Sequence, residues 1–216
     1  MAVLSDLYDG DIRMADEGVG RLLDELAAHR LLDDTLLILT SDHGEEFLDH
    51  GGVAHSQTLY DEMLHVPLLI RLPGAKYGGT RVASTAQHVD IVPTILDLLG
   101  LAASAGLDGS PLFARRSADQ GEAYSFLRLG GREIEGLTTT TWKVVHNISN
   151  PGQPPFEVYD LTRDPLERSS LATARDVRLN YSKVRFPDLG ASLRPAGPSV
   201  DPVKLERLQA LGYVSH

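Results

Sequence analysis

Cysteine is absent from the whole 216-residue chain. Disulfides, zinc–thiolate sites and cysteine nucleophiles are therefore excluded, whatever the compartment. Long apolar runs are absent too, since no stretch approaches the roughly 18 uninterrupted apolar residues of a membrane-spanning helix. The first residues, MAVLSDLYDGDIRMADEG, do not combine a basic region with an apolar run, so we expect no signal peptide at this end.

Basic residues are in the minority. Thirty Asp and Glu face twenty Lys and Arg, which gives a formal net charge of -10. Such a surface repels phosphate backbones, so nucleic acid is not an expected partner. A small anionic substrate is still compatible with this charge, because a bound metal ion inverts the local field. Hydrophobic residues make up 42% of the chain, enough to bury the core of one domain or of one domain with an appendage.

Apolar patterns in the first seventy residues predict a helix and two strands. Residues 9–29 carry apolar side chains at helical spacing with charged residues between them, which predicts an amphipathic helix. The runs TLLILTS (35–41) and VPLLIRL (66–72) are short, continuous and apolar. Such runs are typical of strands that are buried on both faces, as in a parallel sheet.

A second helix is predicted over 91–99. Asp90 stands at its N-cap position, Pro93 lies in its first turn, and Gly100 follows as a C-terminal stop. The order helix, strand, strand, helix is typical of the α/β class, with a mixed or parallel sheet flanked by helices. We assign residues 1–110 to this α/β region.

The residue pattern of the sequence changes in its second half. Short β-rich runs such as GLTTTTWKVVHN and FEVYDL, separated by Gly, Pro and Asn, predict a small antiparallel subdomain over 111–216, with a boundary within 101–122. The stretch 172–203 has no clear period and predicts an extended surface loop. The terminal DPVKLERLQALGYV (201–214) begins with Asp-Pro and has a short helical pattern.

The segment 40–67, TSDHGEEFLDHGGVAHSQTLYDEMLHVP, concentrates chemistry-bearing side chains. In open α/β sheets, ligands bind beyond the carboxyl ends of the strands, where Asp42 and His43 follow the first predicted strand. A carboxylate and an imidazole suit a divalent metal ion. Gly44 allows the backbone break that both side chains need to reach one ion. From the residues alone, a loop with a helix cap explains this triplet equally well.

The other polar residues of this part of the chain have simpler explanations. Glu45, Glu46 and Asp49 are expected to be solvated or to lie in the first turn of a helix, and His65 is expected to pack. A surface or core position is the expectation for His88, His146 and Trp142.

The chain resembles the sulfatases, within the wider alkaline-phosphatase-like superfamily. The resemblance is carried by several segments in the family's order: YDGDIRMADEGVGRLLDEL, TLLILTSDHGEEFLDHG, HSQTLYDEMLHVPLLIRLPG, VDIVPTILDLLGL and DGSPL. Later segments, WKVV, VYDLTRDPLERSSL and LQALGYV, resemble the C-terminal subdomain of the family. The resemblance implies a partial sulfatase-like α/β domain followed by that subdomain.

The resemblance implies roles for four residues. Asp42 and His43 match the family's pair of metal ligands. His55 matches the position of a Lys or His that faces the sulfate or phosphate group, where it stabilises the anion or acts as a general acid. His50 matches a recurrent histidine of one bacterial branch, with a substrate contact or a structural hydrogen bond as its two roles. The implied cofactor is one divalent ion: Ca²⁺, Mn²⁺ or Mg²⁺, with Zn²⁺ as a further candidate.

The resemblance also implies what the chain lacks. The family's nucleophile motif, Cys/Ser-x-Pro-Ser-Arg, whose first residue becomes formylglycine, does not occur here. The early paired aspartates of the metal site are not found either. We therefore expect a truncated chain, the C-terminal portion of a metal-dependent sulfatase, that is inactive by itself. Its compartment stays open, since an N-terminal half could carry a signal.

The expected substrate is an anionic small-molecule or glycan sulfate ester. Many sulfatases have Asp-Asn where this chain has Asp42-His43, and Asp-His is familiar in phosphodiesterases, phosphonate hydrolases and phosphoglycerol transferases of the superfamily. These enzymes remain one alternative. A non-catalytic binding module or fragment is the other, and the edges of an incomplete sheet would favour self-association.

Overall fold

The computed structural model describes residues 2–55, 57–103, 106–114 and 121–193. Its residues form two compact units, one made of Met1–His55 with Tyr60–Val82 and the other of Ser56–Leu59 with Ala83–His216. The division into domains at residue 110 stays a prediction. No helix among the described residues is long and apolar enough to cross a membrane.

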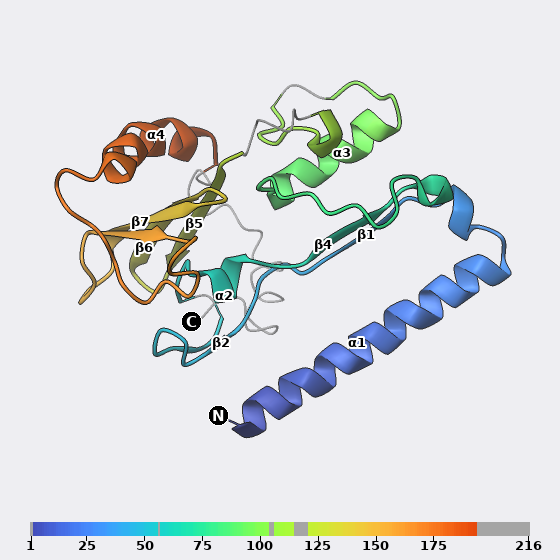
Figure 1. Cartoon of the computed structure of the whole chain (residues 1–216), viewed down its shortest axis with the longest axis horizontal. Coiled ribbons are helices and arrows are strands. Elements are labelled where there is room, and N and C mark those ends of the chain that lie inside the picture. The colour runs from blue at the N-terminus through green and yellow to red at the C-terminus, as the bar shows by residue number, and fades with distance from the viewer. Residues whose placement is uncertain (1, 56, 104–105, 115–120, 194–216) are drawn as a thin grey trace, which may run out of the picture. The chain divides into compact units, whose positions relative to one another are not determined.

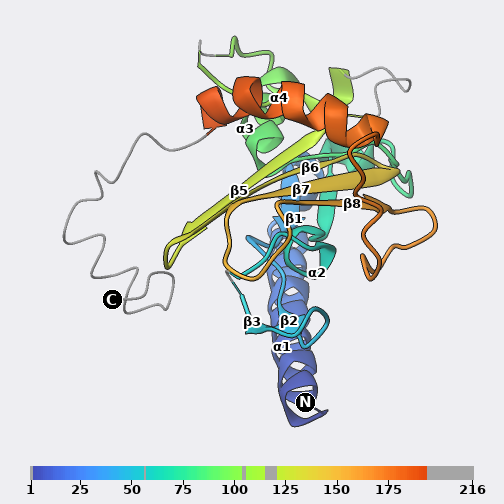
Figure 2. The same cartoon turned by 90° about the vertical axis from the view of Figure 1, so that its left-hand side faces the viewer.

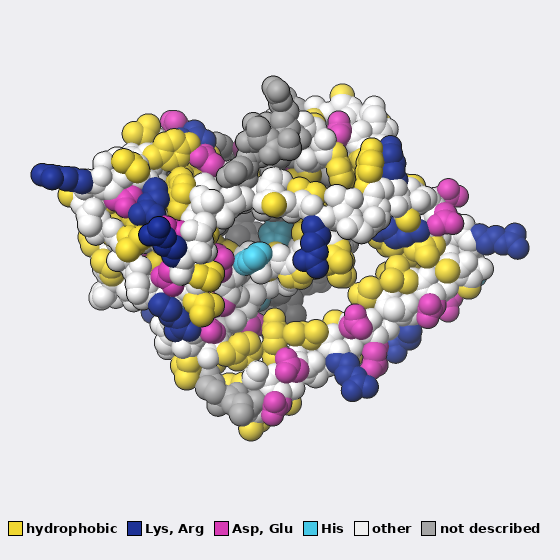
Figure 3. All heavy atoms as spheres, viewed as in Figure 1, with side chains coloured by type: hydrophobic (Ala, Val, Ile, Leu, Met, Phe, Trp, Pro, Cys, Tyr) yellow, Lys and Arg dark blue, Asp and Glu magenta, His cyan; other side chains and the backbone are white. Residues whose placement is uncertain are grey.

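The first unit begins with a long helix, α1 (Ala2–Ala28), so the helix predicted over 9–29 is confirmed and starts earlier. It is amphipathic: Figure 3 shows apolar side chains along one side of α1 and charged ones along the other. The helix ends where Arg30 adopts a positive φ of 59° and Leu31 donates its N–H to the carbonyl of Leu26. This bond joins residues five positions apart, and it gives the Leu26 carbonyl a partner at the helix end.

The two predicted apolar strands are present and pair with each other. Strands β1 (Leu37–Thr40) and β4 (Leu68–Arg71) run side by side in Figure 1. Their pairing is antiparallel, with Thr40 opposite Leu68, a direction that is compatible with the expected mixed sheet. The expected burial on both faces is wrong, because Leu39 and Leu69 are 42% and 57% exposed.

The direction of the pairing follows from the connection between the strands. A parallel pair needs a long crossover, usually a helix. Among the described residues of 41–67, the helices and strands are instead the two-residue strands β2 (Glu46–Phe47) and β3 (Val53–Ala54) and the one-turn helix α2 (Asp61–Leu64). The segment therefore leaves the carboxyl end of β1 and returns to the adjacent end of β4. An apolar run is equally compatible with either direction, so the sequence pattern could not decide this.

The second unit contains the predicted second helix, α3 (Ile91–Leu98), which Gly100 ends with a φ of 66°. Asp90 does not cap α3 with its side chain. It is fully buried, and its carboxylate accepts hydrogen bonds from the N–H groups of Gln87 and Ser110, at 2.8 and 2.9 Å. Asp90 therefore occupies the predicted N-cap position, but its carboxylate connects two loops and makes no cap bond to the helix. Short 3-10 turns lie at the following positions of the chain: Leu32–Asp34, Pro73–Ala75, His88–Asp90 and Leu112–Ala114.

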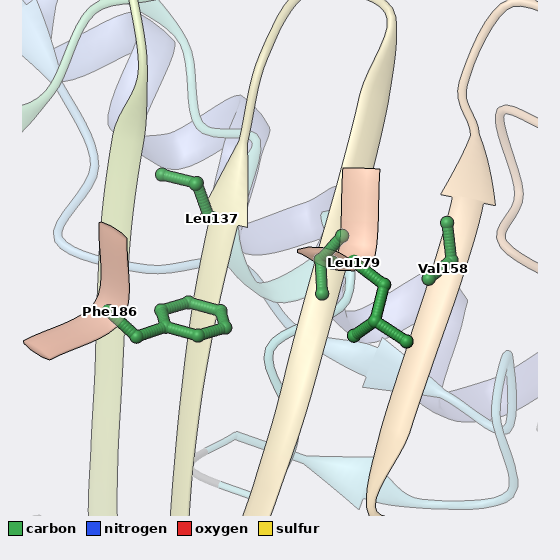
Figure 4. Close-up of a cluster of buried hydrophobic side chains, with 5 residues drawn as sticks. Leu137, Val158, Leu179 and Phe186 are labelled. Atoms are coloured by element: carbon green, nitrogen blue, oxygen red, sulfur yellow. The ribbon is translucent and has the colours of Figure 1, made fainter. Parts of the chain in front are cut away.

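The predicted antiparallel region is confirmed as a four-stranded sheet. Its strands follow each other in chain order: β5 (Ala123–Leu129), β6 (Arg132–Thr138), β7 (Trp142–Ser149) and β8 (Phe156–Asp160). Helix α4 (Val177–Leu193) lies across this sheet in Figure 2. The core between them is formed by buried apolar side chains, four of which are labelled in Figure 4: Leu137, Val144, Val158, Leu179 and Phe186.

Helix α4 (Val177–Leu193) corrects the extended loop expected over 172–203. Asp176 begins it, with a carboxylate oxygen that accepts the N–H of Arg178 at 2.9 Å. Pro187 lies inside the helix, and such a residue weakens any prediction of helix from sequence. What stabilises α4 is the packing of Leu179 and Phe186 on the sheet. The helix predicted over 201–214 lies outside the described residues.

Candidate metal and anion site

The turn after β1 orients the two predicted metal ligands. Ser41 donates its hydroxyl to the carbonyl of His43 at 2.7 Å, and Asp42 accepts the N–H of His43 at 3.0 Å. These bonds fold the chain tightly, so that Asp42 Oδ2 lies 3.8 Å from His43 Nε2. Two ligands of one ion are separated by about 3.0–3.6 Å when the bonds are near 2.1 Å. The pair therefore fits a shared divalent ion with little movement.

A backbone hydrogen bond sets the orientation of the His43 ring. Nδ1 lies 2.9 Å from the carbonyl oxygen of Gly44. A carbonyl can only accept, so Nδ1 carries a proton, and in the neutral ring Nε2, on the Asp42 side, carries the lone pair. Metal-binding histidines are typically held in this way by a second hydrogen bond.

Gly44 is required by close packing. A Cβ at this position would lie 1.9 Å from the carbonyl oxygen of Glu62, closer than any real contact. Its N–H donates to the carbonyl of Met63 at 2.9 Å. Gly44 therefore does more than permit a break of the chain, since it lets the turn after β1 lie directly against the backbone of α2.

His55 is brought to His43 by the hairpin of β2 and β3. In this ladder Glu46 pairs with Ala54, so Glu45 and His55 form the next position beyond it. Glu45 Oε1 accepts a 2.8 Å hydrogen bond from His55 Nδ1. The rings of His43 and His55 lie 4.5 Å apart between centroids. The structure thus joins two histidines that are twelve positions apart in the sequence.

Glu45 is a site residue that the sequence interpretation missed. It was expected to be a solvated charge, but its side chain is only 24% exposed. His43, Glu45 and His55 each offer a ligand atom within 4.8 Å of the other two. The sequence offered only a weak signal for Glu45, because placing it beside His55 requires the register of a two-residue ladder.

Glu46 is also misassigned by the sequence interpretation. It is 1% exposed, and its Oε1 accepts N–H groups of His50 and Gly52 at 2.9 and 2.6 Å. Asp49 adds a 3.0 Å bond from the N–H of Phe47. The two carboxylates therefore replace missing backbone partners inside the hairpin, and this ordering holds Glu45 and His55 at its open end.

His50 lies in a second acid–imidazole pair. Its Nδ1 is 2.6 Å from Glu62 Oε1, and its ring stacks on Tyr60 with centroids 3.7 Å apart. The side chains of His50 and Glu62 are 12% and 17% exposed. This geometry supports the structural role among the two considered for His50, because the pair ties the hairpin to α2.

The remaining predicted positions divide between surface and core. His65 does not pack: its side chain is 82% exposed, 3.8 Å from Asp61. His88 is exposed as expected. His146 stacks on Phe156 at 4.2 Å, and Trp142 packs against the core of the sheet.

Comparison with known proteins places this geometry in a family. Residues 4–101, which contain the turn after β1, the hairpin and α3, match the family model described as Sulfatase. This chain belongs to the sulfatase family. It is 33% identical over 191 residues to arylsulfatase K of Mus musculus, covering 78% of the chain and 34% of that protein.

Bacterial sulfatases show the same similarity. An N-acetylglucosamine-6-O-sulfatase of Bacteroides thetaiotaomicron is 28% identical, with 76% of this chain and 31% of that protein covered. A solved structure, in complex with its substrate D-glucosamine-2-N,6-O-disulfate, superposes with a TM-score of 0.72 at 25% identity, over 87% of this chain and 40% of that one. The chain spans about a third of the length of the curated relatives it matches.

Proposed function

We propose that this chain provides the metal-binding and anion-binding turn of a sulfate-ester hydrolase. The observation that carries the proposal is the placement of His55 beside His43, in a chain whose relatives are named as sulfatases. Asp42 and His43 hold a divalent ion, for which their 3.8 Å separation is suitable. When bound, this ion polarises a sulfate oxygen and activates the nucleophile.

His55 acts on the sulfate group. With both ring nitrogens protonated, Nδ1 donates to Glu45 and Nε2 is the donor for a sulfate oxygen or for the leaving alcohol. Glu45 orients the ring and compensates its positive charge. At 27% exposure His55 remains accessible to a small anion, yet is partly shielded from the solvent that weakens such contacts.

We propose that the substrate is a sulfated sugar or a similar small sulfate ester. Two similar proteins support this class: an N-acetylglucosamine-6-O-sulfatase of Bacteroides thetaiotaomicron, and a protein whose solved structure holds its substrate D-glucosamine-2-N,6-O-disulfate. Phosphate-ester hydrolysis is the competing function, and the observation in its favour is His43 at the second ligand position.

The 216-residue chain by itself is proposed to be inactive. It contains neither cysteine nor a Ser-x-Pro-Ser-Arg segment, so no residue can become the formylglycine nucleophile of the family. The purified chain with Ca²⁺, Mn²⁺ or Mg²⁺ should therefore release no product from an aryl sulfate above the metal-only background. Turnover that depends on His55 would overturn this proposal.

Anion binding tests the function without turnover. Inorganic sulfate and inorganic phosphate are titrated separately into the chain with Mn²⁺ or Mg²⁺, and the ring resonances of His55 are followed by NMR. Sulfate should shift these resonances in the wild type and in His65→Ala, and not in Asp42→Asn. A response to phosphate alone would favour the phosphate-ester alternative, whereas no response to either anion would remove His55 from the proposed function.

A further inference from the structure

We propose that His43, Glu45 and His55 form a binding site for a zinc-like transition-metal ion. This site differs from the one in the proposed function, where Asp42 accompanies His43 and His55 faces the anion. His43 comes from the turn after β1, and Glu45 and His55 come from the two sides of the β2–β3 hairpin. The inference does not depend on the proposed function.

The ligand atoms are already close to the spacing of a metal centre. One ligand atom of each side chain lies within 4.8 Å of the other two. In a tetrahedral zinc site with bonds near 2.1 Å, ligand atoms are separated by about 3.4 Å. Glu45 Oε1 and His55 Nδ1, 2.8 Å apart, now share a proton, and an ion that replaces this proton would open the pair by about 0.6 Å.

The ligand types select the metal. Two imidazoles and one carboxylate suit Zn²⁺, Co²⁺, Ni²⁺ or Fe²⁺. Ca²⁺ and Mg²⁺ prefer oxygen ligands alone, and more of them than this site supplies. Three protein ligands leave a coordination position for water or an anion, as in catalytic zinc sites. The set therefore predicts a preference for zinc over the hard ions considered for the Asp42–His43 pair.

The surrounding structure holds the ligands in place. The bond from His43 Nδ1 to the Gly44 carbonyl makes Nε2 the coordinating nitrogen. Glu45 precedes the ladder whose turn is ordered by the buried Glu46. With exposures of 24% to 29%, the three ligand side chains are sheltered but reachable by an ion. A preformed site of this kind loses little conformational entropy on binding.

Zinc titration of the full 216-residue chain tests the proposal. ZnCl₂ alone is added in a calorimeter, and Co²⁺ is used in parallel as a visible-absorption probe of tetrahedral coordination. We expect one zinc per chain, and affinity reduced by at least about tenfold in Glu45→Gln and His55→Ala. The matched control is His65→Ala, which removes an exposed histidine next to α2 and should leave the affinity unchanged. Circular dichroism confirms that each variant is folded.

Three outcomes would overturn the inference: no zinc binding by the wild type, equal affinity for zinc and Ca²⁺, or unchanged zinc affinity in both site variants. The variant Asp42→Asn separates this inference from the proposed function. If zinc binding falls in Asp42→Asn and not in Glu45→Gln, the ion sits on the Asp42–His43 pair, so the new site fails while the proposed function stands. If sulfate binding fails and zinc binding behaves as expected, the proposed function fails and the zinc site stands.

Discussion

Glu45 and His55 are joined by a 2.8 Å hydrogen bond across the open end of the β2–β3 hairpin. The bond depends on the register of a ladder with only two residue pairs, Glu46 with Ala54 and Phe47 with Val53. A change of one residue in this register would separate the two side chains. The order of the site therefore depends on the order of its hairpin.

Replacement of Gly44 by Ala should displace the turn that carries Asp42 and His43. The added Cβ would meet the Glu62 carbonyl oxygen at 1.9 Å, so the backbone must move. We expect a loss of about 1–3 kcal/mol in unfolding free energy and weaker binding of Zn²⁺ and Mn²⁺. Urea unfolding and calorimetry measure the two effects. The control is Gly10→Ala in α1, where nothing lies within 4 Å of the new Cβ and the helix should gain about 0.5–1 kcal/mol.

Replacement of Glu46 by Ala should disorder the hairpin. The N–H groups of His50 and Gly52 lose a buried acceptor, at a cost of about 1–3 kcal/mol. Hydrogen exchange of these two amides should become faster, and the NMR contact between the rings of His43 and His55 should weaken. Glu17→Ala, on the exposed face of α1, serves as the control. Unchanged exchange at both amides would show that the carboxylate does not order the turn.

Replacement of Glu167 by Ala should strongly destabilise the second unit. Glu167 and Lys143 form a 2.8 Å ion pair in which both side chains are fully buried. Removing one partner leaves a buried charge and typically costs about 3–5 kcal/mol. Urea unfolding should show this loss, whereas Arg128→Ala, in a partly exposed pair with Glu133, should cost less than about 1 kcal/mol.

A double variant identifies the cause of that loss. Lys143→Met combined with Glu167→Met removes both charges and keeps most of the buried volume. It should recover most of the stability lost in Glu167→Ala, because no uncompensated charge remains. If the double variant is as unstable as the single one, the effect comes from packing and not from charge.

The stability of α4 should depend on acid through Asp176. Its hydrogen bond with the Arg178 side chain lowers the pKa of this carboxyl below the ordinary value of 3.8. A lowered folded-state pKa means that the contribution is present above the unfolded value and is lost as the pH falls through the folded value. Asp176→Ala should therefore cost about 1–2 kcal/mol at pH 7, as expected for a helix N-cap, and progressively less below about pH 4.

Circular dichroism of urea unfolding at several pH values measures this difference. The control is Asp97→Ala, an exposed position in α3, which should show no such loss of stability at pH 7. A stability difference between wild type and Asp176→Ala that stays constant from pH 7 to pH 3 would contradict the assigned role of Asp176.

Local patterns were sufficient for part of the fold. Apolar periodicity placed α1, continuous runs placed β1 and β4, and Pro93 with Gly100 placed α3. Each of these signals lies within one segment of the chain. The proximity of Asp42 and His43 likewise follows from the sequence, since the side chains of two neighbouring residues at a sharp turn can lie close together. Their metal remains a prediction.

Other features depend on contacts between distant segments. The antiparallel direction of β1 and β4 follows from the path of the loop between them, and α4 is stabilised against its Pro187 by packing on the sheet. Glu46 was expected to be a surface charge, but it is buried and accepts hydrogen bonds from two backbone amides. No periodicity within one segment encodes such relations.

The sequence by itself therefore determined the family resemblance, the main helices and strands, and the pair Asp42–His43. Only the tertiary structure shows that Glu45 lies beside His43 and His55. The proximity of these three side chains requires the hairpin register and the close packing of Gly44 on α2. Residues near in sequence are held together by the covalent chain, whereas residues far apart meet only where backbone hydrogen bonds and packing fix the path between them.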